Sequence, residues 1–229
     1  MEHANILIVE DDADINRLLC AILEGAGYTC RAAFSGSEAL LWAEKYDYDL
    51  VLLDLMLPGV TGEEFIQRVR RGKTMPIIVV SAKLGVDHRV NVLKLGADDF
   101  IPKPFDNSEV LARVEAQLRR SRQFSVPAAE ALSAGPLTLD LDSHAALVDG
   151  REVPLTGREF DILALLMKNP RRAFSRAQIY EAVWGEDFIG DDNTVNVHVS
   201  NLRAKLAKAD PDCSYIKTVW GIGFKFNLS

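Results

Sequence analysis

The chain has 229 residues, of which 48% are hydrophobic and 26% are charged, a composition typical of soluble globular proteins. Its formal net charge of −7 gives no overall indication of a nucleic-acid partner. Three scattered cysteines and no apolar run near the roughly 18 residues of a membrane span disfavour a disulfide framework and a membrane protein. The first residues do not resemble a signal peptide, so we expect a cytoplasmic location.

Short apolar runs alternate with helix-forming segments in the first half of the chain. The runs are almost wholly apolar, as in strands buried on both faces of a parallel sheet: NILIV (5–9), LVLL (50–53) and PIIVV (76–80). Between them, apolar residues recur at helical spacing, and Gly and Pro separate the units. The pattern predicts an α/β domain with a doubly wound parallel sheet over residues 1–121.

The pattern changes after residue 121. Residues 122–135 are rich in Ser and Ala and show no core period, so we expect a linker there. Leucines then alternate with polar residues, and Asp149-Gly150 is typical of a hairpin turn. Three helical patterns follow, at 157–168, 175–183 and 192–208. Two short β-like runs come last, so residues 136–229 are predicted to form a winged helix-turn-helix domain.

Polar side chains follow the predicted strands at the point where each strand ends. They are Glu10, Asp11 and Asp12, then Asp54, then Ser81, and finally Lys103 after the apolar pair at 100–101. Because the carboxyl ends of parallel strands meet at one edge of a sheet, we expect these side chains to lie together. Each has an ordinary alternative: Asp12 and Ser81 could cap the following helix or turn, and Lys103 could be a solvated lysine. The ordinary alternatives together would require a coincidence at four strand ends, so the joint pattern favours a functional site.

The set fits phosphoryl transfer to a carboxylate. Asp54 ends a buried strand and can act as a nucleophile to give an acyl phosphate. Lys103 would neutralise the transferring group, and the Ser81 hydroxyl would donate to a phosphate oxygen. The expected Mg²⁺ ligands are Asp11, Asp12, Asp54 and a backbone carbonyl near Met56. The three acids after the first strand would repel a flavodoxin-type cofactor phosphate, and Met56 stands where haloacid-dehalogenase-type phosphatases carry a second acid.

Four stretches resemble the receiver domain of bacterial two-component response regulators. They are EDD (10–12), LLDLMLPGVTG (52–62), VVSAK (79–83) and GADDFIPKPF (96–105), within residues 4–120. The resemblance implies a five-stranded flavodoxin-like sheet of order 2-1-3-4-5 and a cis peptide at Lys103-Pro104. It also implies that Asp54 accepts phosphate from a phosphohistidine of a sensor histidine kinase. Ser81 and Phe100 would occupy the hydroxyl and aromatic switch positions.

The predicted helix at 192–208 has a polar face suited to DNA. From 194 to 208 it contains no acid, although the domain as a whole is slightly acidic. Four residues at helical spacing should face the core: Val195, Val199, Leu202 and Leu206. The other faces would then offer amides, hydroxyls and cations to the major groove, namely Asn196, His198, Ser200, Asn201, Arg203 and Lys205. The ordinary alternative is a solvated surface helix.

The second half resembles the winged-helix effector domain of the OmpR/PhoB subfamily, over 136–228. The stretches that carry the resemblance are LTGREFDILALLMKNP, SRAQIYEAVWG, NTVNVHVSNLRAKL and YIKTVWGIGFKF. It implies a recognition helix at 192–208 and a wing at 215–226, with Lys217 and Lys225 contacting the DNA backbone or minor groove. Trp220 stands where the wing usually has an arginine, and with Lys225 it resembles VanR-type glycopeptide-resistance regulators. The loop at 185–192 matches the place where relatives touch RNA polymerase.

Subfamily receivers form homodimers through the face made by the fourth helix, the fifth strand and the fifth helix. Charged residues of both signs fall on these elements and can pair across a two-fold axis: Arg89, Asp98, Asp99, Glu109, Arg113 and Arg120. Ordinary surface charge is the alternative for each of them. We expect phosphate on Asp54 to favour the conformation that dimerises.

The sequence therefore predicts a phosphorylation-dependent transcriptional regulator that binds promoter DNA and is not an enzyme. Three alternatives remain at this point. The second domain could be catalytic, although residues 121–229 contain no GxSxG elbow or Gly-rich phosphate loop. It could be a winged domain that binds protein instead of DNA. The regulator could also act without phosphorylation, which would not require the complete set of acids, hydroxyl and lysine.

Overall fold

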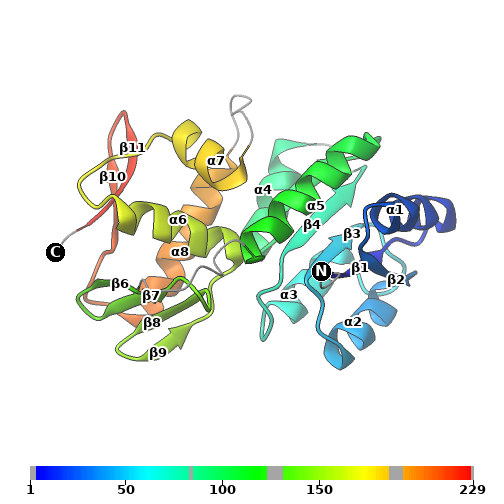
Figure 1. Ribbon diagram of the computed structural model, residues 1–229, viewed down its shortest axis with the longest axis horizontal. Coiled ribbons are helices and arrows are strands. Elements are labelled where there is room, and N and C mark those ends of the chain that lie inside the picture. The colour runs from blue at the N-terminus through cyan, green and yellow to red at the C-terminus, as the bar shows by residue number, and fades with distance from the viewer. Residues whose placement is uncertain (1–3, 83–84, 123–130, 186–192, 228–229) are drawn as a thin grey trace. The chain divides into compact units, whose positions relative to one another are not determined.

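The computed structural model describes residues 4–82, 85–122, 131–185 and 193–227, except for the side chains of 86–87 and 119–122. The chain divides into two compact units, Met1–Arg120 and Ser121–Ser229, drawn together in Figure 1. Among the described residues, no helix is both long enough and apolar enough to cross a membrane.

The N-terminal unit is built on a parallel sheet of order β2-β1-β3-β4-β5, as predicted. Its strands are β1 (Asn5–Val9), β2 (Thr29–Ala33), β3 (Leu50–Leu53), β4 (Ile77–Ser81) and β5 (Asp99–Pro102). The buried runs predicted at 5–9 and 50–53 match β1 and β3, and β4 begins one residue later than predicted. Every residue of β3 and β4 is buried, because helices cover both faces of the sheet.

Alternate strand residues pack on helices on opposite faces of the sheet. On one face, Ile6 and Ile8 share a core with Leu19 of α1 and Val114 of α5. These two helices are α1 (Ala13–Gly25) and α5 (Asn107–Arg122). On the other side, α2, α3 and α4 pack in succession (Figure 1). Their bounds are Gly36–Lys45, Gly62–Val69 and Val86–Leu95. The doubly wound fold leaves the carboxyl ends of the strands at one edge, uncovered by these layers.

The C-terminal unit has the predicted winged-helix architecture. An antiparallel sheet, β6-β7-β8-β9, precedes three helices and a hairpin. The sheet strands are Ala131–Ala134, Leu137–Asp140, Ala145–Val148 and Arg151–Val153. The helices are α6 (Gly157–Lys168), α7 (Arg176–Trp184) and α8 (Thr194–Ala209), and the hairpin consists of β10 (Ile216–Val219) and β11 (Gly223–Phe226). Asp149 and Gly150 both have positive φ in the turn between β8 and β9, as such two-residue turns require.

Strand β6 lies inside the segment 122–135 that was expected to be a linker. It pairs antiparallel with β7, and Leu132 and Ala134 pack against the core while their neighbours stay exposed. The four residues ALSA are too few, and their side chains too small, to stand out as a strand in the sequence. Their backbone pairing is fixed by β7 instead.

One core joins the helices and the hairpin of the C-terminal unit. Phe160 of α6, Trp184 of α7, Leu202 of α8 and Phe226 of β11 all belong to it. Helix α6 begins with a complete capping box, in which Thr156 and Glu159 each accept a hydrogen bond from the other's backbone N–H, and this satisfies two donors at the helix start. Helix α8 and the hairpin are therefore held by the same packing.

Candidate functional site

Lys103 joins two carboxylates at the carboxyl edge of the sheet. Its Nζ lies 2.6 Å from Oε2 of Glu10 and 2.6 Å from Oδ2 of Asp54. Glu10 follows β1, Asp54 follows β3 and Lys103 follows β5, so the parallel topology brings together residues far apart in the chain. The Lys103-Pro104 peptide bond is cis, as the resemblance to receivers implied.

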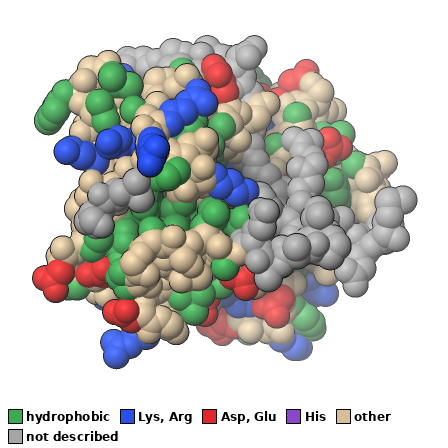
Figure 2. Space-filling model, turned by 60° about the vertical axis from the view of Figure 1, so that its left-hand side comes forward, with side chains coloured by type: hydrophobic (Ala, Val, Ile, Leu, Met, Phe, Trp, Pro, Cys, Tyr) green, Lys and Arg blue, Asp and Glu red, His purple; other side chains and the backbone are tan. Residues whose placement is uncertain are grey.

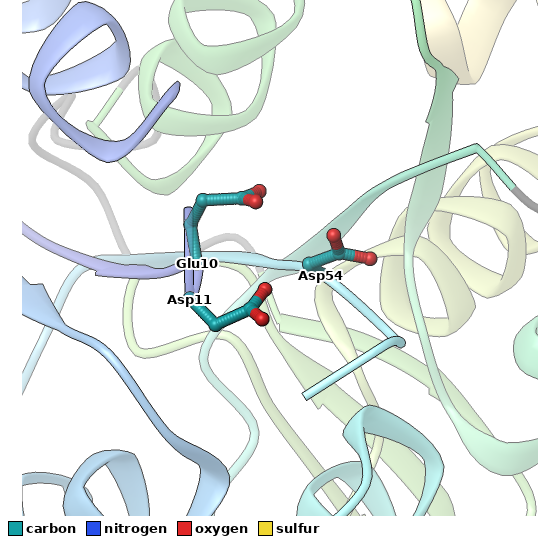
Figure 3. Close-up of side chains that lie close together, drawn as sticks. All are labelled: Glu10, Asp11 and Asp54. Atoms are coloured by element: carbon teal, nitrogen blue, oxygen red, sulfur yellow. The ribbon is translucent and has the colours of Figure 1, made fainter. Parts of the chain in front are cut away.

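The acidic cluster contains Glu10, Asp11 and Asp54, whose carboxylate oxygens lie within 4.8 Å of one another (Figure 3). Glu10 and Asp54 are buried, whereas Asp11 is exposed. Glu10 was named at the strand end in the sequence but was not assigned to the site. Its contact with Lys103 could not be found there, because the two residues are separated by 93 positions.

Asp12 does not belong to this cluster. It caps the following helix instead, which was the alternative role considered for it in the sequence. Its Oδ1 accepts hydrogen bonds from the backbone N–H of Asp14 at 2.8 Å and of Ile15 at 3.0 Å. It is the N-cap of α1, and these hydrogen bonds lower its pKa. The chain turns into the helix directly after the strand, so Asp12 faces the helix start. Glu10 therefore takes the place in the cluster that was predicted for Asp12.

Burial and ion pairing shift the pKa values of Glu10 and Lys103 in opposite directions. Burial raises the pKa of Glu10 although Lys103 opposes the shift. Burial alone would lower the pKa of Lys103, but its hydrogen bonds to Asp54 and Glu10 outweigh it and the pKa is raised. One ammonium thus contacts two carboxyl groups, and a third, that of Asp11, lies near both of them. Such an excess of carboxylate oxygens at an accessible edge has the chemistry that Mg²⁺ prefers, and the residues present fit that ion.

The backbone around Asp54 is held closely. The N–H of Met56 donates to Oδ1 of Asp54 at 3.1 Å, and the Met56 side chain is exposed. A Cβ on Gly62 would lie 2.5 Å from the carbonyl oxygen of Asp54, so only glycine permits this approach of α3. Ser81, at the end of β4, and Phe100, in β5, are both buried.

The charged residues predicted on the dimerisation face are largely paired within the chain. Asp98 is 0% exposed, and its Oδ2 accepts hydrogen bonds from Arg70 at 2.8 Å and from the N–H of Ile77 at 2.9 Å. The expectation that Asp98 lies on the surface is therefore wrong. Arg113 contacts Oδ2 of the buried Asp99 at 3.2 Å and Glu109 at 3.0 Å. Arg89 is half-buried, and the Arg120 side chain lies outside the described part.

Helix α8 buries the four residues predicted to face the core, and also Thr194, Val197 and His198. Val195, Val199, Leu202 and Leu206 are all buried. His198 is only 1% exposed, and its ring centroid lies 5.4 Å from that of Trp184. The prediction that His198 faces outward is wrong, because α7 covers this side of the helix as well.

Two cations of α8 make contacts inside the domain. Arg203 donates to the carbonyl oxygen of Ile216 and to Oγ1 of Thr218, and Lys205 lies 2.6 Å from the buried Glu159. The polar side chains left toward solvent include the exposed Ser200 and the half-buried Asn196 and Asn201. On the hairpin, Lys217 is exposed and Lys225 is half-buried. Most of the predicted RNA-polymerase loop at 185–192 lies outside the described residues.

Comparison with known proteins identifies both units. Residues 6–115 match the family model described as response regulator receiver domain, and residues 150–226 match that described as transcriptional regulatory protein, C terminal. The chain is 42% identical to the transcriptional regulatory protein ResD of Bacillus subtilis, over 99% of this chain and 97% of ResD. This chain is a response regulator. It consists of a receiver and a winged-helix DNA-binding domain, and its relatives are transcriptional regulators.

Other relatives of this response regulator agree with the assignment. It is 40% identical to SrrA of Staphylococcus aureus, over 97% of this chain and 95% of SrrA. Among solved structures, a RitR mutant matches with a TM-score of 0.80 and 27% identity, covering 99% of this chain and 100% of that one. DrrB of Thermotoga maritima, an OmpR/PhoB homologue, matches with a TM-score of 0.53 and 25% identity, covering 98% and 99%.

Proposed function

We propose that Asp54 accepts a phosphoryl group from a phosphohistidine of a sensor histidine kinase. A carboxylate oxygen of Asp54 forms the new O–P bond, the N–P bond to histidine breaks, and the histidine nitrogen retains the electron pair. The observation that carries the proposal is the position of Lys103 Nζ, 2.6 Å from Asp54 and beside the acidic cluster. An ammonium there can pair with an oxygen of the transferred group.

A Mg²⁺ ion held by Asp11, Asp54 and the Met56 carbonyl would neutralise further charge on that group. Glu10 keeps Lys103 oriented toward Asp54 through its own 2.6 Å contact. The Ser81 hydroxyl would then donate to a phosphate oxygen, and Phe100 would respond to this movement. These two side chains are buried, so a rearrangement of either is transmitted to its packed neighbours.

Phosphorylation is proposed to favour a homodimer formed by α4, β5 and α5. Arg89, Glu109, Arg113 and Arg120 remain candidates for contacts across the two-fold axis. Asp98 and Asp99 instead fix Arg70 and Arg113 from inside.

In the DNA-binding domain, α8 would enter the major groove with Asn196, Ser200 and Asn201 toward base edges. Lys217 and Lys225 would contact the backbone, while Arg203 and Lys205 hold the helix in place. Residues 185–192 would contact RNA polymerase, and the protein would act in the cytoplasm.

The phosphoryl acceptor can be tested by intact mass measurement. The protein is incubated with Mg²⁺ and acetyl phosphate, and a phosphate-sized increment is expected for the wild type. Asp54→Asn should lose the increment, because the amide cannot form the acyl phosphate. Asp47→Asn is the control, since Asp47 is exposed and pairs with Lys73. An increment that survives Asp54→Asn would refute the acceptor assignment.

Dimerisation and DNA binding need separate measurements. Light scattering with and without beryllofluoride, a phosphate mimic, should show a shift from monomer to dimer, and an unchanged monomer would refute the switch. Titration of duplex DNA over a range of salt concentrations should give a steep salt dependence. Failure to bind at low salt would favour a winged domain that binds protein.

A further inference from the structure

The tip of the wing exposes two large apolar side chains. Trp220 is 91% exposed and Ile222 is 57% exposed, in the turn between β10 and β11. The N–H of Ile222 donates to the carbonyl of Val219 at 3.0 Å, and Gly221 between them has φ 75°, a conformation that favours glycine. The turn is therefore well defined, and large apolar groups fixed at an exposed tip are typical of a contact surface.

The wing is anchored to the rest of the domain. Phe174 and Phe224 exchange two backbone hydrogen bonds, of 2.8 and 2.9 Å. A Cβ on Gly223 would lie 2.1 Å from the carbonyl oxygen of Phe174, so the hairpin backbone touches the segment before α7. Arg203 of α8 also bonds two residues of β10. A tip presented this rigidly loses little conformational entropy when it binds.

Cationic side chains lie on both strands of the wing and in a groove beside its tip. A groove of about 250 Å³ lies beside it, lined by residues that include Arg176 of α7, Asn196 of α8 and Trp220, and by no Asp or Glu among the described residues. Lys217 and Lys225 are directly opposite each other in the β10–β11 register, and like charges in such positions repel. An anionic partner removes that repulsion. On the face drawn in Figure 2, Lys and Arg side chains gather beside hydrophobic ones at the upper left.

We propose that Trp220 and Ile222 form an apolar contact with the deoxyribose walls of the DNA minor groove. Lys217 and Lys225 pair with the phosphates beside it. The inference rests on the proposed DNA-binding function. The apolar contact supplies a part of the binding free energy that does not depend on counterion release. The opposed lysines and the acid-free groove favour a polyanion over a protein surface. Apolar side chains in the minor groove are physically suited to this contact because the sugar carbons line it.

The test measures affinity as a function of salt for a short duplex that the wild-type protein has selected from a random-sequence pool. Trp220→Ala is expected to weaken binding about tenfold at every salt concentration. This is the loss of affinity expected when roughly 60 Å² of apolar surface is no longer buried against the DNA. The slope of log K against log salt should stay unchanged. Lys217→Gln should instead reduce the magnitude of that slope by about one.

Leu41→Ala is the control, since Leu41 of α2 is 58% exposed and belongs to the receiver. It should bind like the wild type. Equal affinity of Trp220→Ala and the wild type would overturn the inference, as would a loss confined to low salt. Both outcomes leave DNA binding itself intact. Absence of wild-type binding would refute the DNA-binding function and the inference together. Because Trp220 is exposed, the variant should keep the wild-type unfolding midpoint.

Discussion

Lys103→Met is the substitution that most directly probes the acidic cluster. Methionine retains much of the aliphatic length but removes the ammonium that contacts Glu10 and Asp54, each at 2.6 Å. Both carboxyl groups stay buried, and Asp11 remains near them. The variant therefore places three acids together without an internal cation, and the folded receiver should lose stability.

The loss can be sized from the burial of the three groups. Removing one partner of a buried ion pair costs roughly 3–5 kcal/mol, because the remaining charge is left uncompensated. The Lys103 side chain is 13% exposed, so solvent offsets part of this, and we expect about 3 kcal/mol in the free energy of unfolding at neutral pH. For a unit of about 120 residues, the unfolding midpoint should fall by roughly 10 °C.

Urea and thermal unfolding of the full chain would measure this loss. The difference should shrink at lower pH, because burial already raises the pKa of Glu10 and a protonated Glu10 needs no cation. Mg²⁺ should stabilise the variant more than the wild type, since a cation bound to the folded state replaces the lost charge.

Lys73→Met is the matched control. Lys73 pairs with the fully exposed Asp47 at 2.8 Å, and exposed pairs contribute at most about 1 kcal/mol. Equal losses for the two variants, or a gain in stability for Lys103→Met without Mg²⁺, would refute the proposed balance of charge in the cluster.

Three further predictions concern a cap, a glycine and a buried acid. Asp12→Ala should cost about 1 kcal/mol in urea unfolding through loss of the α1 cap, yet leave the phosphate increment in intact mass; loss of that increment would restore Asp12 to the metal site. Gly223→Ala should destabilise the C-terminal unit strongly in thermal unfolding, because its methyl would meet Phe174; a wild-type midpoint would contradict this. The raised pKa of Glu10 means that the folded state binds more protons, so its contribution to stability is lost as pH rises from about 4 to the raised value. Glu10→Gln should remove this pH dependence from urea titrations, and an unchanged pH profile would exclude Glu10 as its source.

Local sequence patterns predicted most of the helices and strands, and the gathering of polar side chains at one edge of the parallel sheet. The apolar runs at 5–9 and 50–53 became β1 and β3, because a strand buried on both faces must be apolar throughout. The same logic placed Asp54 and Lys103 at one edge, since parallel strands end together. Helical spacing likewise identified the buried residues of α8 such as Val195 and Leu202. All of these depend on local periodicity, which a single chain displays directly.

Most of the contacts between side chains could be known only from the folded structure. Glu10 and Asp12 are two positions apart, yet one contacts Lys103 and the other caps a helix. His198 has a polar side chain on a helix, but Trp184 covers it, and Asp98 is buried because Arg70 reaches it from another element. Apart from the Asp12 cap, whose partners are Asp14 and Ile15, each outcome depends on a partner distant in the chain. Local pattern fixes which elements form, whereas burial and charge pairing are set by neighbours that only the fold supplies.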